Sequence, residues 1–431
     1  MRRFITDRLI SWKNSPARKP LIIRGARQVG KTYTVLDFAE RNFAGKVHYF
    51  NFEKNPEYGT VFEGNLDTDR IVAELELISG NRIKKGEELL FFDEIQECHK
   101  AIASLRYFYE DNADIPVIAA GSLLEFAMND ISFPVGRIQL LEMYPMTFAE
   151  YLMAIGKDVV ASRVTDEDAS FSSSVIEAVN EELLKYFRVG GMPECVKSFV
   201  ETGSYIEVAN VQTDLIATFR QDFSKYAGRS DKRCLNDVLT SVARKTGEKI
   251  KYTQLADGYT NPTIKKAFEL LEMARLFTRI RYATPSGFPL SLHASDKYFK
   301  TVFLDVGLFS NINGVNTRNI LQKKEMSSLW NGKIAEQFVG QELVAHHNND
   351  VFYWGGEKRG SSAEVDYLIV NNGEVAPVEV KSGKSGKMKS LHLLLRQYPN
   401  LQKAFVLSET NLGKIEEQKL RFLPLFCAVR L

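Results

Sequence analysis

The sequence predicts an α/β fold for the first third of the chain, in which a mainly parallel sheet is covered by helices. Short apolar runs recur at 21–25, 47–53, 88–94, 116–122 and 137–146. The segments between these runs are long enough for helices of several turns and carry apolar residues near i, i+3 and i+4. Strands that alternate with helices in this way form parallel sheets, because a crossover helix connects each strand to the next.

The length and composition indicate a globular protein of two or three domains. The 431 residues exceed what one hydrophobic core usually holds, which is about 100–200 residues. Apolar residues make up 44% and charged residues 26%, as in ordinary folded proteins. The formal net charge of +2 is small for this length, so any contact with nucleic acid must come from local basic clusters.

Several features predict a cytoplasmic protein without a membrane partner. The four cysteines are scattered without a CxxC pair, which favours reduced thiols. Charges interrupt the apolar residues of the first fifteen positions, so this segment is expected to form an amphipathic helix and not a signal peptide. The sequence contains no run of about 18 uncharged apolar residues that would cross a bilayer.

A glycine-rich segment, "RGARQVGKTY", follows the first predicted strand and precedes a predicted helix. It fills the pattern GxxxxGK(S/T) in the context that this motif requires, which an accidental glycine turn would lack. In such a loop the backbone amides and the helix N-terminus face phosphates, the lysine reaches the β- and γ-phosphates, and the hydroxyl ligates Mg²⁺. The motif therefore predicts an ATP and Mg²⁺ site. The predicted nucleotide-binding residues are Gly25, Ala26, Arg27, Gln28, Val29, Gly30, Lys31, Thr32, Tyr33 and Asp93.

The segment "LLFFDE" supports this site, because it is an apolar strand that ends in two carboxylates, the form of a Walker B motif. Asp93 is expected to hold Mg²⁺ together with Thr32. Glu94 is expected to orient the attacking water and remove its proton. Glu94 and Lys31 are therefore the first predicted catalytic residues.

Two further residues near this site allow two interpretations each. Ser122 ends the fourth predicted strand and either senses the γ-phosphate or caps the helix that follows. Arg137 leads into the next strand and is either an arginine finger for a neighbouring nucleotide or part of a surface ion pair. A working finger would require a homo-oligomer.

The segments "RGARQVGKT", "LLFFDEIQ", "AAGS", "YPMTFAEY" and "GGMPE" resemble the bacterial and archaeal ATPases of the AAA-like class that carry an extra, poorly characterised C-terminal region. The resemblance covers nearly the whole chain. It implies ATP hydrolysis with Mg²⁺, with Ser122 as the sensor and Arg137 as a candidate finger. It also implies that residues 180–225 form a helical lid over the nucleotide.

The pattern after the first 150 residues predicts three further segments. A connector and the helical lid span 151–228, and the polar stretch 156–174 is expected to be an irregular loop. The order helix, helix, helix, hairpin predicts a winged helix at 229–312. Its third helix, with Asn261 as N-cap, either presents its lysines to the major groove of DNA or only packs, because glutamates of the same helix repel phosphate.

The last segment, 325–431, is predicted to be α/β and holds a second candidate site. A hairpin closed at Asn-Asn-Gly brings Asp366 near Glu379 and Lys381, and a preceding helix carries Glu336. Carboxylates bind divalent metals, and a lysine beside them orients water for phosphodiester attack. The constellation resembles the PD-(D/E)XK nuclease fold and implies a second divalent metal, Mg²⁺ or Mn²⁺. The other interpretation is the solvated face of a hairpin.

These observations leave three hypotheses for the function. The first is an ATP-hydrolysing protein coupled to a winged helix and a nuclease-like domain that acts on or near DNA. The second is a DNA-binding regulator that uses ATP as a switch and has an inactive nuclease fold. The third is a metal-dependent endonuclease. A lysine cluster at 381–389 beside the second candidate site either contacts phosphate or is a solvated loop.

Overall fold

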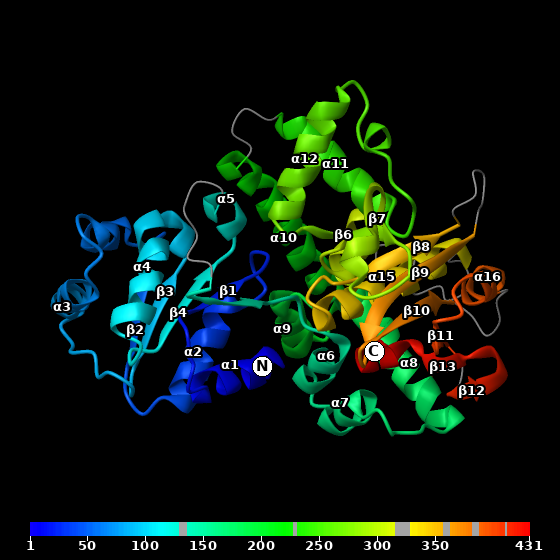
Figure 1. The fold of residues 1–431 in the computed structure, drawn as a ribbon, viewed down its shortest axis with the longest axis horizontal. Coiled ribbons are helices and arrows are strands. Elements are labelled where there is room, and N and C mark those ends of the chain that lie inside the picture. The colour runs from blue at the N-terminus through cyan, green and yellow to red at the C-terminus, as the bar shows by residue number, and fades with distance from the viewer. Residues whose placement is uncertain (129–135, 227–230, 315–327, 357–362, 382–387, 410–411) are drawn as a thin grey trace. The chain divides into compact units, whose positions relative to one another are not determined.

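The computed structural model describes the chain except for residues 129–135, 227–230, 315–327, 357–362, 382–387 and 410–411. The described residues form two compact units, Met1–Tyr144 and Pro145–Leu431 (Figure 1). The predicted α/β class is confirmed, since both units combine helices with a sheet. The four predicted segments remain a prediction, because the structure divides the chain only once.

The first unit is built on a five-stranded sheet of order β2-β3-β4-β1-β5, in which neighbouring strands are parallel. The strands are β1 (Leu21–Arg24), β2 (Val47–Asn51), β3 (Leu89–Asp93), β4 (Val117–Gly121) and β5 (Gln139–Glu142). The helices are α1 (Ile5–Asn14), α2 (Lys31–Asn42), α3 (Thr68–Ser79), α4 (His99–Asp111) and α5 (Leu124–Met128), with 3₁₀ turns η1 (Pro56–Phe62) and η2 (Ile95–Glu97).

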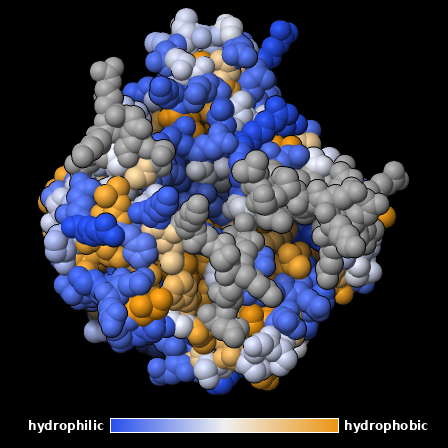
Figure 2. Space-filling view, turned by 90° about the vertical axis from the view of Figure 1, so that its right-hand side faces the viewer, coloured by the Kyte–Doolittle hydropathy of each residue, from blue (hydrophilic) through white to orange (hydrophobic). Residues whose placement is uncertain are grey.

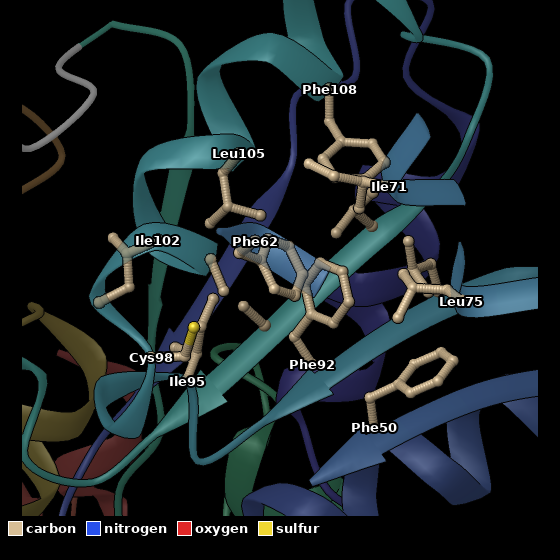
Figure 3. Packing of buried hydrophobic residues seen from close by; sticks show 14 of the residues in the cluster. Phe50, Phe62, Ile71, Leu75, Phe92, Ile95, Cys98, Ile102, Leu105 and Phe108 are labelled. Carbon is tan, nitrogen blue, oxygen red and sulfur yellow. The ribbon is translucent and has the colours of Figure 1, made fainter. Parts of the chain in front are cut away.

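The core of this unit fixes strand β3 in place. All five residues of β3 are buried, as expected for a central parallel strand with both faces covered. The ring of Phe92 contacts those of Phe62 and Phe108, with centroids 5.6 Å and 6.1 Å away, and Phe50 packs from β2 (Figure 3). Burial of these rings therefore determines where β3 ends, and with it the position of Asp93.

The second unit begins with helices and continues into a mixed sheet. Its helices are α6 (Phe148–Ala154), α7 (Asp158–Thr165), α8 (Ser173–Val189), α9 (Pro193–Thr202), α10 (Tyr205–Tyr226), α11 (Lys232–Arg244), α12 (Asn261–Met273), α13 (Val306–Ile312), α15 (Ser328–His346) and α16 (Lys389–Gln397). Its 3₁₀ turns are η3 (Tyr252–Gln254), η4 (Leu290–His293), η5 (Glu416–Gln418) and η6 (Leu425–Arg430).

The sheet of the second unit has eight strands in the order β12-β13-β11-β10-β9-β8-β6-β7. They are β6 (Phe277–Ala283), β7 (Ala294–Phe303), β8 (Phe352–Gly355), β9 (Glu364–Asn371), β10 (Glu374–Val380), β11 (Ala404–Ser408), β12 (Gly413–Ile415) and β13 (Leu420–Pro424). The antiparallel hairpin β6–β7 joins this sheet through the parallel pair β6–β8. The hairpin expected to form a wing is thus continuous with the strands of the last predicted segment.

Three local predictions are tested directly by these elements. The β9–β10 hairpin is confirmed, and Asn372 and Gly373 at its turn have positive φ. The irregular loop at 156–174 is wrong in part, because α7 forms there and buries Ala161 and Val164. The N-cap of α12 is Thr260, and Asn261 is already helical.

The segment "GGMPE" turns the chain between α8 and α9 against a buried carboxylate. Gly190 has φ +73°, and a Cβ there would lie 2.2 Å from Asp305 Oδ1. A Cβ on Gly191 would lie 2.0 Å from the carbonyl oxygen of Met146. Asp305 accepts hydrogen bonds from the backbone N–H groups of Gly191 (2.6 Å), Gly307 and Leu308 (both 3.0 Å). The glycines are needed because backbone and carboxylate approach so closely.

In the face shown in Figure 2, hydrophilic and hydrophobic side chains are interspersed. Among the described helices none is both long enough and apolar enough to traverse a bilayer. The cysteines Cys98, Cys195, Cys234 and Cys427 are buried free thiols.

We predict that Asp305→Ala destabilises the second unit by about 3–5 kcal/mol, because it leaves three buried backbone N–H groups without their acceptor. Urea unfolding followed by circular dichroism should show a lower midpoint. Exposed Asp257 provides the matched control, and Asp257→Ala should change stability by less than about 0.5 kcal/mol. Equal midpoints for the two variants would contradict the role of Asp305.

Candidate nucleotide-binding site

The loop between β1 and α2 has a backbone that two glycines make possible. A Cβ on Gly25 would lie 2.1 Å from the carbonyl oxygen of Met143, so only glycine fits there. Gly30 is the N-cap of α2 and has φ +93°, a left-handed conformation that glycine adopts at low cost. The N-terminus of α2 therefore follows directly on the loop and adds its positive end to the site.

Lys31 is held inside the loop. Its ammonium donates hydrogen bonds to the carbonyl oxygens of Gly25 (3.0 Å) and Ala26 (2.8 Å), and only 7% of the residue is exposed. Burial lowers the pKa of Lys31 to about 8, although attraction by Glu94 and Asp93 partly offsets this effect. The loop thus concentrates a positive charge that is only weakly solvated.

Asp93 at the end of β3 collects donors from two neighbouring elements. The Thr32 hydroxyl lies 3.2 Å and 3.0 Å from its two carboxylate oxygens. The Tyr49 hydroxyl and the Asn51 side-chain amide, both on β2, donate to Oδ2 at 2.9 Å and 3.1 Å. A hydroxyl and a carboxylate in contact are oxygen ligands of the kind that Mg²⁺ uses, so Thr32 and Asp93 fit the predicted metal.

Glu94 lies next to Asp93, just beyond the strand. It has φ +49°, an unusual value for a residue with a side chain, which turns the chain into η2. The side-chain amide of Gln96 donates to Glu94 Oε2 at 2.7 Å. Burial raises the pKa of Glu94, while the hydrogen bond from Gln96 and the charge of Lys31 lower it. A carboxylate with a raised pKa is a stronger base once it is ionised.

The other predicted residues of the loop are distributed as follows. Ala26 and Val29 are buried, Gln28 has φ +66°, and Tyr33 is 59% exposed.

Ser122 is buried, and its hydroxyl accepts a hydrogen bond of 3.3 Å from Arg27 Nε. The structure therefore places Ser122 beside the loop, while its sensor role stays a prediction.

Arg137 forms an ion pair at the surface, with Nε 3.0 Å from Glu110 Oε1 and nearly half of its side chain exposed. This is the second of the two interpretations given for it from sequence. Its role as an arginine finger stays a prediction.

Several residues that no sequence motif marks also support this site. Arg3 donates to the carbonyl oxygens of Val29 (3.0 Å) and Tyr144 (2.6 Å) and so holds the loop against the end of the sheet. Nothing in the sequence near Arg3 indicates this contact. Asn51 could have been predicted from the sequence, because it is a polar residue at the end of an apolar strand, as Ser122 is.

The second candidate site lies in the second unit. Its hairpin brings together Asp366 and Glu379, and Lys381 Nζ lies 2.5 Å from Glu379 Oε1, as expected for residues on the same side of a strand. Burial raises the pKa values of Glu336, Asp366 and Glu379. Lys384 and Lys387 of the predicted basic cluster lie outside the described residues.

Lys300 and Glu364, which no sequence motif marks, also belong to this second cluster. Lys300 of β7 lies 2.9 Å from Glu336 and 2.5 Å from Glu364, measured from its Nζ to the nearest carboxylate oxygen. In the part of the chain that the structure describes, no three histidine, cysteine, aspartate or glutamate side chains are arranged to hold a metal ion.

Comparison with protein-family models agrees with the first site. Residues 17–152 match the model of a family described as an AAA domain. The N-terminal unit is an AAA-like domain. Beyond this AAA-like domain, residues 180–319 and 331–427 match two models described only as domains of unknown function, DUF8612 and DUF4143. None of the curated proteins compared with the chain matches it.

Several solved structures resemble the chain weakly. The ORC1 protein of Aeropyrum pernix in complex with DNA is 12% identical, with a TM-score of 0.30, over 73% of this chain and 92% of that one. A RuvB variant of Thermotoga maritima is 17% identical, with a TM-score of 0.30, over 63% and 85%. Drosophila ORC bound to DNA is 14% identical, with a TM-score of 0.29, over 72% and 95%. Similarity at this level carries no inference about function.

We predict that ATP binding to the AAA-like domain takes up protons at pH 8–9 and hardly any at pH 7. Lys31 has a pKa of about 8, and a bound phosphate raises it, because the anion favours the charged ammonium. At pH 7 the ammonium is already formed, whereas above pH 8 binding must protonate it, so affinity falls as the pH rises. Calorimetry in buffers of different ionisation enthalpy measures the uptake. Equal proton uptake at pH 7 and pH 8.5 would contradict this assignment.

Proposed function

We propose that the N-terminal unit binds ATP with Mg²⁺ and hydrolyses it. The observation that carries this proposal is the meeting of Lys31, Thr32, Asp93 and Glu94 at the carboxyl ends of β1 and β3. Ligands of parallel α/β sheets bind at this edge, where the order β3-β4-β1-β5 departs from the chain order.

The residues of the loop would bind the triphosphate. The backbone N–H groups of residues 25–32 supply donors, and the ammonium of Lys31 exchanges its two carbonyl contacts for phosphate oxygens. Thr32 and Asp93 would hold Mg²⁺, which when bound neutralises charge on the phosphates. Tyr49 and Asn51 orient Asp93 through their hydrogen bonds.

Glu94 would act on the water. In the proposed reaction the oxygen of water forms a bond to the γ-phosphorus, and the bond from that phosphorus to the β–γ bridging oxygen breaks, which releases ADP and inorganic phosphate. Glu94 accepts the proton that the water loses. Gln96 holds Glu94 Oε2 through its amide and leaves Oε1 for the water.

Glu94→Gln should bind ATP with nearly unchanged affinity and lower the turnover number by about 10²–10⁴-fold, because the amide cannot accept the proton. Lys31→Ala should instead lower the affinity for ATP by about 10- to 100-fold, because a charged donor is lost. Calorimetry gives the affinities, and release of phosphate gives the turnover.

Two exposed residues serve as matched controls for these variants. Glu97→Gln and Lys100→Ala carry the same chemical changes nearby and should leave both quantities unaltered. Wild-type turnover in Glu94→Gln would exclude Glu94 as the base, and wild-type affinity in Lys31→Ala would exclude this phosphate site.

We further propose that the protein binds DNA and acts as a regulator that ATP switches. Helix α12 exposes Lys265 and Lys266. Both glutamates that were expected to repel phosphate have cationic partners: Glu269 lies 3.7 Å from Lys265 Nζ, and Glu272 accepts from Arg279 Nε at 3.0 Å. The repulsion is therefore weaker than the sequence suggests.

If α12 contacts DNA, the double variant Lys265→Glu/Lys266→Glu should weaken binding of duplex DNA at least about tenfold at low salt, and the wild-type affinity should fall as salt rises. Fluorescence anisotropy measures this affinity. The double variant Lys232→Glu/Lys251→Glu, at exposed lysines of the same unit, is the charge-matched control. Equal losses in both double variants would exclude a specific role for α12.

A further inference from the structure

A buried lysine lies among the carboxylates at which a divalent cation was predicted. Only 2% of the Lys300 side chain is exposed. Its Nζ lies 2.9 Å from Glu336 Oε1, 2.5 Å from Glu364 Oε1 and 3.7 Å from Asp366 Oδ1. The ring of Tyr353 contacts the same ammonium, with its centroid 5.6 Å away. One cation thus already contacts carboxylates from α15 and β9 at once.

The neighbouring oxygens are also engaged by other donors. Lys249 Nζ lies 3.0 Å from Glu364 Oε2, and Lys381 Nζ lies 2.5 Å from Glu379 Oε1. Asp366 Oδ2 accepts a hydrogen bond of 2.8 Å from the backbone N–H of Val380. Donors therefore engage at least one oxygen of each carboxylate. Within the described residues, Glu379 Oε2 is buried without a hydrogen-bond partner, but one such oxygen is fewer than the several ligands that a divalent ion needs.

The buried ammonium of Lys300 opposes a metal ion as well. The four carboxylates of Glu336, Glu364, Asp366 and Glu379 face three ammonium groups, those of Lys249, Lys300 and Lys381. A divalent ion would have to enter within a few ångströms of a buried ammonium, where repulsion is poorly screened. It would also have to take oxygens from donors already in place, although divalent ions of this kind need several oxygen ligands.

We propose that Lys300 is the resident cation of this carboxylate cluster and that the cluster binds no divalent metal. The residues present do not fit the metal that the nuclease resemblance implies. Lys300 instead joins β7, from the segment 180–319, to α15 and β9, from the segment 331–427. This proposal stands apart from ATP hydrolysis, because none of its residues belongs to the nucleotide site.

A manganese titration of the full chain tests this proposal. The chain carries Asp93→Asn to remove the carboxylate of the nucleotide site, contains no nucleotide, and is titrated with Mn²⁺ while free Mn²⁺ is followed by electron paramagnetic resonance. We expect no binding at the cluster when Lys300 is present. In Lys300→Met the carboxylates lose their cation, and Mn²⁺ affinity should rise at least about tenfold.

Two outcomes would overturn the proposal. One is binding of Mn²⁺ to the Lys300 protein with a dissociation constant below about 100 μM that Asp366→Asn abolishes, since it would show a working metal site. The other is an unchanged affinity in a folded Lys300→Met variant, since it would show that the lysine does not exclude the metal. The first measurement decides the question even if the variant does not fold.

Thermal unfolding gives a second readout that does not use a metal. Lys300→Met should lower Tm by about 5–10 °C, because it leaves buried carboxylates without their partner. Addition of Glu336→Gln should recover part of this loss, since it removes one of those charges. Lys389→Met, at an exposed lysine, is the matched control and should leave Tm unchanged. No loss in Lys300→Met relative to this control would contradict the role of Lys300 as the resident cation.

Discussion

The position of one carboxylate, Asp93, at the end of a fully buried strand is the constraint on which the nucleotide site depends. Strand β3 cannot shift without exposing rings such as Phe92, whose neighbours are themselves buried. A carboxylate at that point must be satisfied by donors, and Thr32, Tyr49 and Asn51 provide them. Packing of the core and the hydrogen bonds of Asp93 together fix the positions of α2, β2 and β3 relative to one another.

Buried charge organises the second unit in the same way. Asp305 fixes the turn at Gly191, 114 residues earlier, through a backbone hydrogen bond. Lys300 connects a hairpin to a helix 36 residues later through Glu336. Each group is costly to bury alone and stabilises the fold only together with its partners, so each holds distant segments in one arrangement.

The sequence predicted those parts of the sites whose residues lie close together in the chain. The loop from Gly25 to Thr32 is a contiguous motif, and the hairpin places Glu379 and Lys381 on one side by the two-residue period of a strand. Arg3 and Lys300 act across long separations in sequence, and their own neighbours carry no pattern. The hairpin β6–β7 is a similar case. Its local pattern fits a wing, but the pairing of β6 with β8 involves a strand about 70 residues later, which no local pattern indicates.

The sequence by itself determined the α/β class, the glycine-rich loop from Gly25 to Thr32 and the strand that leads to Asp93 and Glu94, because periodicity and short motifs encode what lies within a few residues. Only the tertiary structure decided which cation meets Glu336, Glu364 and Asp366, and which donors hold Asp93. Those contacts depend on the pairing order of strands and on side chains that reach across the sheet. A sequence pattern does not indicate such distances, because these contacts form only in the folded chain, once the core has packed.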